Sequence, residues 1–131
     1  MRALPFWEEK CWGEVLHCFH NPQASVSYLK VQAGYRCSRH YHWDRANDFI
    51  VISGQIMIET WGLGSLVGEH TTTSPKTELL VPGDTHSIPS KLLHRFNVIE
   101  SGEVIEVYWA DHGGVVSIDD IVRIDVGGKI P

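Results

Sequence analysis

The sequence predicts an all-β fold, a sandwich or barrel of short strands. Turn signals built from Gly, Pro and Asn recur roughly every eight to fifteen residues, and almost no stretch shows helical periodicity. The chain has 131 residues, of which 43% are hydrophobic, enough for one core but short for two domains. We therefore expect a single all-β domain that spans residues 1–131.

The first half of the chain contains three predicted strands. Residues 12–20 are apolar on both faces, which is typical of a covered strand, and Asn21–Pro22 ends it because a residue before proline avoids helical geometry. Residues 25–32 alternate as a second strand that ends at Gly34, and residues 35–42 form a third. Residues 43–46 are polar and predict a turn.

The second half is predicted to contain two hairpins around a long loop. Residues 48–53 and 56–61 flank the turn signal at Gly54, and a second turn is predicted at residues 100–102. The further predicted strands are residues 77–81, 86–88, 94–99 and 104–110, while residues 118–125 read equally well as a helical turn or a last strand. The segment from Gly62 to Thr77 predicts a loop in which Glu69 and His70 would contact a ligand if it covers a site; mobile surface is the commoner fate of such loops.

Composition excludes several classes of function. The formal charge is −5 and the basic residues are scattered, so a nucleic-acid partner is not expected. No leader pattern or membrane-length apolar run is present, which predicts a soluble cytoplasmic protein without a membrane partner. Cys11, Cys18 and Cys37 match no zinc or redox spacing and suit a reducing compartment. Cys37 has odd parity against His40 and is expected to face away from it.

Three histidines are the best candidates for a metal site. His40 and His42 are two residues apart in a predicted strand and should share a face. His94 lies in an apolar run that is interrupted by few other polar groups. A single histidine on an apolar strand is more often a hydrogen-bonded core residue than a ligand, but imidazole is also the commonest ligand for a transition metal.

Two spacings resemble the sequence motifs of the cupin superfamily. The first motif is matched by Gly34, His40, His42, Asn47 and Gly54, and the second by Gly83, Pro89 and His94. This resemblance implies a jelly-roll β-barrel in which His40, His42, His94 and the residue at position 47 hold a metal. The chain departs from the pattern at Asn47, where the family has Glu, and at Lys91, where it has Gly. An amide offers only a neutral oxygen, so the identity and affinity of the metal are open.

Further stretches resemble the C-terminal cupin domain of type II mannose-6-phosphate isomerases. They are residues 10–14, 28–31, 105–107 and 119–123. The resemblance implies a metal-dependent aldose–ketose isomerase, or a relative that kept the barrel and changed its chemistry.

The expected cofactor is a divalent transition metal, either zinc, manganese, iron or nickel. Three imidazoles leave positions open for two adjacent oxygens of a sugar. Glu106, His86 or a metal-bound hydroxide would move the proton, and burial in an apolar strand would raise the pKa of Glu106 toward working pH, unless an Arg pairs with it. Arg36 and Lys91 would contact an anionic group of the substrate, although a solvated arginine at the barrel rim is an equal expectation for Arg36.

Two other functions fit the same residues. Three histidines with open positions also suit an Fe(II)-dependent dioxygenase, and a barrel of this kind can bind a sugar or another small molecule without turnover. The N-terminal segment has more apolar side chains than a flexible terminus needs, namely Leu4, Phe6, Trp7 and Trp12. It therefore predicts a homodimer through the N-terminal strands.

Overall fold

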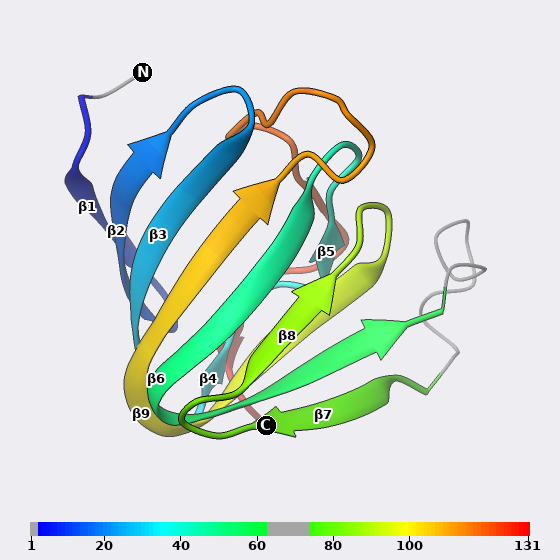
Figure 1. Ribbon diagram of the computed structural model, residues 1–131. Helices are drawn as coiled ribbons and strands as arrows, with labels where there is room; N and C mark the ends of the chain where they lie inside the picture. The colour runs from blue at the N-terminus through cyan, green and yellow to red at the C-terminus, as the bar shows by residue number, and fades with distance from the viewer. Residues whose placement is uncertain (1–2, 63–73) are drawn as a thin grey trace.

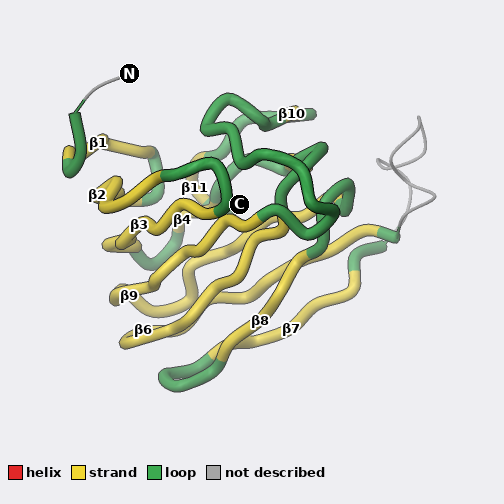
Figure 2. The backbone as a smooth tube through the Cα atoms, turned by 45° about the horizontal axis from the view of Figure 1, so that its top comes forward, coloured by secondary structure: helices red, strands yellow, loops and turns green. Residues whose placement is uncertain are grey.

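The computed structural model describes residues 3–62 and 74–131, and every regular element in these ranges is a β-strand (Figures 1 and 2). The strands are β1 (Phe6–Lys10), β2 (Gly13–His20), β3 (Ala24–Val31), β4 (Tyr35–Arg36), β5 (His40–Tyr41), β6 (Ala46–Trp61), β7 (Lys76–Leu80), β8 (Thr85–Ile88), β9 (Leu93–Trp109), β10 (Val122–Arg123) and β11 (Gly128–Lys129). No helix in the described part of the chain could span a membrane. The predicted all-β fold is confirmed.

The strands form one strongly curled antiparallel sheet with β9 at its centre. The N-terminal strands follow the order β1–β2–β3–β9, while β6 pairs with β9 along nearly its whole length and also carries β7 and β8. Figure 1 shows β6 and β9 side by side and bent, so that the sheet folds back over itself. The short strands β4 and β5 pair with the first half of β9, and the curled sheet forms a half-barrel of the jelly-roll type.

The two predicted hairpins at Gly54 and at residues 100–102 are wrong. Each glycine instead lies inside a long strand, where the strand bends and its register shifts. A Cβ at Gly102 would overlap the carbonyl oxygen of Ser53, and one at Gly54, whose φ is +78°, would lie 2.7 Å from the carbonyl oxygen of Glu100. The two strands therefore bend together at a place where only glycine fits, as barrel corners require.

The core lies between the two halves of the curled sheet. Strand β3 shows the predicted alternation, with Ser25, Ser27, Leu29 and Val31 on its buried face. Trp12 was predicted to contribute to an apolar surface, but it is buried, and its ring lies edge-on 5.1 Å from Phe96. Aromatic pairs with this geometry stabilise a core beyond their buried area.

The predicted strand over residues 35–42 is split into β4 and β5. Residues 37–39 between them belong to no strand, so side-chain parity does not carry from Cys37 to His40. Cys37 is consequently buried in the core, where its Sγ accepts a hydrogen bond from the Phe96 amide. The tail contains no helix: a hydrogen-bonded turn over residues 117–120 precedes β10, which pairs with β5, and β11 pairs with β4.

Candidate metal centre

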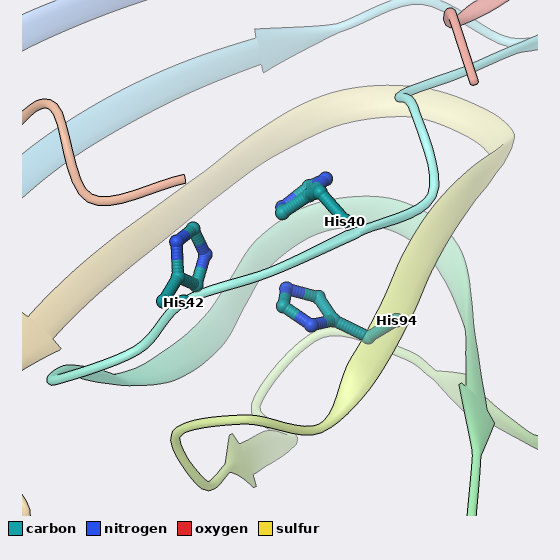
Figure 3. Close-up of side chains that lie close together, drawn as sticks. All are labelled: His40, His42 and His94. Carbon is teal, nitrogen blue, oxygen red and sulfur yellow. The ribbon is translucent and has the colours of Figure 1, made fainter. Parts of the chain in front are cut away.

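The three predicted histidines come together at the paired ends of β5 and β9. His40 begins β5 and lies directly opposite His94 of β9, while His42 follows β5 by one residue. Their ring centroids are 4.5 to 5.4 Å apart, and one ligand atom from each lies within 4.8 Å of the others. Figure 3 shows the three rings facing one space from two segments of chain. The structure therefore contains a three-histidine group that can hold a metal ion.

Each of these rings is bonded through Nδ1 to a backbone carbonyl oxygen. The acceptors are Ser38 for His40 at 2.8 Å, Leu92 for His94 at 2.8 Å, and Asp120 for His42 at 2.6 Å. A carbonyl only accepts, so Nδ1 of each ring carries the proton and Nε2 carries the lone pair. Partners of this kind fix the tautomer and orientation of metal-binding histidines.

The environment keeps the three imidazoles neutral. Burial lowers the pKa of His42 to about 2 and of His94 to about 4, and it lowers the pKa of His40 well below its usual range. Neutral imidazole is the form that binds a metal. The Nε2 atoms of His42 and His94 are buried and have no hydrogen-bond partner among the described residues. Buried unpaired acceptors are costly, so these converging lone pairs fit a divalent transition metal.

Asn47 is fully buried on β6, where it pairs with Tyr108 of β9, whose ring centroid lies 5.2 Å from that of His42. Its Nδ2 donates a 3.0 Å hydrogen bond to the Glu106 carboxylate, while its Oδ1 is buried without a partner among residues 3–62 and 74–131. The amide is therefore oriented, with its oxygen still available. Its predicted role as a fourth ligand stays a prediction.

Glu106 lines a cavity of about 830 Å³ that His40 also lines. The cavity lies between strands β1 to β3 and the C-terminal segment, whose residues Ile121 and Arg123 border it. Burial raises the pKa of Glu106 to about 7, against the opposing effects of its hydrogen bond with Tyr108 and the nearby charge of Arg45. Such a carboxyl group can exchange a proton near neutral pH.

Arg45 is a buried cation in this cavity that the sequence analysis did not find. Its guanidinium lies 3.8 Å from the centroid of the Tyr108 ring and donates to the carbonyl oxygen of Ser117, but its Nε is buried without a partner in the described ranges. No ion pair joins Arg45 to a carboxylate there either. Residues 43–46 had predicted a polar turn, and no local signal shows that a segment 72 residues later covers Arg45.

The other predicted site residues lie elsewhere. His86 lies on β8, 3.3 Å from the Glu78 carboxylate, and lines a smaller cavity of about 360 Å³. Arg36 and Lys91 are not among the described residues that line the larger cavity, although the Lys91 amide donates to the His42 carbonyl. Glu69 and His70 are outside the described residues. Cys37 was expected to face away from His40, but both residues line the larger cavity because the strand is broken between them.

The chain is similar to known proteins in its fold rather than in its sequence. No protein-family model and no curated protein matches the chain. Among solved structures, it is similar to oxalate decarboxylase from Bacillus subtilis, with a TM-score of 0.72 and 13% identity over 92% of this chain and 30% of that one. It is similar to KdgF from Halomonas sp., with a TM-score of 0.65 and 18% identity over 82% of this chain and 89% of that one.

A third similar structure is CapF from Staphylococcus aureus, described as a capsular polysaccharide assembling protein. Its TM-score is 0.69, with 15% identity over 95% of this chain and 35% of that one. The chain thus spans about a third of the oxalate decarboxylase and CapF chains. All three are cupin-fold proteins, and the chain has the cupin fold. Likeness at these identities establishes the fold and leaves the activity to be argued from the site.

Proposed function

We propose that the protein is a metal-dependent enzyme that isomerises or epimerises a small sugar or sugar phosphate. The observation that carries the proposal is a group of three neutral histidines, of which His40 lines the same cavity as a buried carboxyl group with a pKa of about 7. The resemblance of residues 10–14 and 119–123 to mannose-6-phosphate isomerase domains supports the substrate class.

His40, His42 and His94 would hold the metal through Nε2. A divalent ion there supplies Lewis acidity, which makes the proton next to a sugar carbonyl easier to remove. Glu106, as the carboxylate, accepts that proton from carbon and returns it to the neighbouring carbon, or to the opposite face of the same carbon. Asn47 and Tyr108 orient the Glu106 carboxyl through their hydrogen bonds.

Arg45 supports a substrate with a negatively charged group. Its guanidinium is buried in the cavity, pairs with no carboxylate of the described chain, and keeps an unbonded Nε. A buried cation is stabilised by an anionic partner, and arginine binds carboxylate and phosphate oxygens well. Arg45 therefore takes the role of anion contact that the sequence suggested for Arg36 and Lys91.

Proton exchange with solvent tests this function directly. The metal-loaded protein would be incubated in D₂O with a panel of aldose and ketose phosphates and followed by NMR. We expect deuterium at C1 or C2 of a true substrate, with little exchange for His94→Ala and Glu106→Gln. No exchange, combined with O₂ consumption by the iron-loaded protein, would favour a dioxygenase. No activity of either kind would favour a non-catalytic binding barrel.

We also propose that the protein forms a homodimer through its N-terminal edge. Strand β1 is an edge strand of the sheet, and the side chains of Trp7 and Phe19 near this edge are 44% and 50% exposed. Edge strands with exposed aromatic side chains favour association. Sedimentation should give a dimer at micromolar concentration, and Trp7→Lys should shift it toward monomer. A wild-type monomer under these conditions would refute the dimer.

A further inference from the structure

His42 differs from the other two histidines in where its ring is held. His40 and His94 donate through Nδ1 to carbonyls two residues earlier in their own segments. The acceptor for His42 is the carbonyl of Asp120, which is 78 residues away in sequence. Two rings of the group are therefore oriented locally, and the third depends on the C-terminal segment.

Asp120 also holds the backbone that follows His42. Its two carboxylate oxygens accept hydrogen bonds from the amides of Trp43 and Asp44, each at 2.8 Å. On the other side, the Lys91 amide donates to the His42 carbonyl at 2.6 Å. The position of His42 is thus fixed between the turn before His94 and a single residue of the tail.

The tail itself is anchored to the segment that carries the histidines. Arg123 of β10 lies opposite His40, and the Ile124 amide donates to the carbonyl of Arg39 at 3.0 Å. The Arg39 side chain pairs with Asp125, Nε to Oδ2, at 2.7 Å. Asp120 is therefore held at a defined place relative to the three rings.

We propose that Asp120 is a positioning residue of the metal centre: its carbonyl sets the tautomer and orientation of the His42 ring, its carboxylate holds the backbone that follows His42, and together they set the affinity of the centre for its ion. This inference rests on the proposed metal centre and goes beyond the proposed reaction. Side chains and carbonyls that hold a ligand histidine from behind affect metal affinity typically by about 10- to 100-fold. Charged acceptors are also stronger than neutral ones for backbone amides.

The experiment measures Co(II) binding by calorimetry and visible absorption in wild type, Asp120→Ala and Asp119→Ala. Asp119→Ala is the matched control, because it removes the same charge one residue away and because, among the described residues, the Asp119 carboxylate makes no hydrogen bond to the His42 segment. We expect a ~10- to 100-fold loss of affinity for Asp120→Ala and less than about threefold for Asp119→Ala. Asp120→Asn keeps one acceptor oxygen and should fall between wild type and alanine.

Histidine NMR of the metal-free proteins separates positioning from general destabilisation. Long-range ¹H–¹⁵N spectra distinguish the two tautomers of each ring. Both Asp120 variants keep the main-chain carbonyl that accepts from His42, but they weaken or remove the carboxylate bonds from the Trp43 and Asp44 amides that hold this carbonyl in place. In Asp120→Asn, and in Asp120→Ala if it folds, the signals of His42 should therefore change while those of His40 and His94 stay, since their acceptors are local. Equal affinity of Asp120→Ala and Asp119→Ala, or a change in all three rings together, would overturn the proposal.

Both readouts are made without substrate. The proposed isomerase activity can therefore fail while Asp120 still governs Co(II) affinity, and Asp120 can prove neutral in an active isomerase.

Discussion

Replacing Glu106 by Gln should change how stability depends on pH. Burial raises the pKa of Glu106 from its usual 4.5 to about 7 in the folded protein. Between these values the folded state binds a proton that the unfolded state releases, so the wild type loses stability as pH rises from 4.5 to 7. Gln is neutral throughout, has nearly the same shape and still accepts from Asn47, so the variant escapes this loss.

The expected size follows from the pKa. At about 1.36 kcal/mol per pKa unit, a rise from 4.5 to about 7 corresponds to ~3 kcal/mol. Glu106→Gln should therefore equal the wild type near pH 4 and exceed it by about 3 kcal/mol in free energy of unfolding at pH 8. The buried histidines lower stability below pH 6.5 in both proteins, because their pKa values are depressed, and this effect cancels in the difference.

The assay is urea unfolding of the metal-free proteins from pH 4 to pH 9. Glu103→Gln on the same strand is the control, because the hydrogen bond from Tyr28 lowers the pKa of Glu103. Its substitution should cost stability at neutral pH rather than add it. A constant difference between Glu106→Gln and wild type across the pH range would refute the buried, proton-exchanging carboxyl group.

Three further predictions concern the metal, the barrel corner and the thiols. Asn47→Glu should retain zinc longer than wild type during dialysis against a chelator, because it adds negative charge, and should lower metal-free stability; equal or shorter retention would argue against position 47 as a ligand. Gly102→Ala should lower the free energy of unfolding, measured in urea, by at least about 2 kcal/mol, because the added Cβ overlaps the backbone of β6. Gly128→Ala is the control and should change this free energy little, because no atom lies within 4 Å of the added Cβ; equal effects would contradict the shared bend. Cys11 is exposed and should react with a thiol reagent well before Cys37, which is buried and whose pKa is raised to about 12 by burial; similar rates would show that the core opens.

The three histidines could be predicted because the signals that place them are short in range. His40 and His42 lie two residues apart, and the spacing around His94 matches a second motif. The pairing of β5 with β9 is then enough to bring His94 next to the other two histidines. The predicted turns at Gly54 and Gly102 failed for the opposite reason. A glycine suits a hairpin turn and a strand bend equally, and which one forms depends on whether both halves find the same distant strand.

Contacts between segments that are distant in sequence could also not be predicted. Arg45 follows His40 and His42 in a segment that predicts a polar turn, and its burial depends on Tyr108 of β9 and on the return of the tail at Ser117. Asp120 likewise acts on His42 across most of the chain. The orientation of Cys37 was predicted wrongly because the alternation of side chains was assumed to continue to His40, whereas the strand is interrupted between the two residues.

Zinc-edge X-ray absorption of the metal-loaded protein tests the central claim most directly, because the claim is that three histidine Nε2 atoms form one metal centre. We expect three imidazole nitrogens at about 2.0–2.1 Å with oxygen completing the shell, and loss of one imidazole in His94→Ala. Sulfur at about 2.3 Å, or a protein that retains no zinc after gel filtration, would contradict the account.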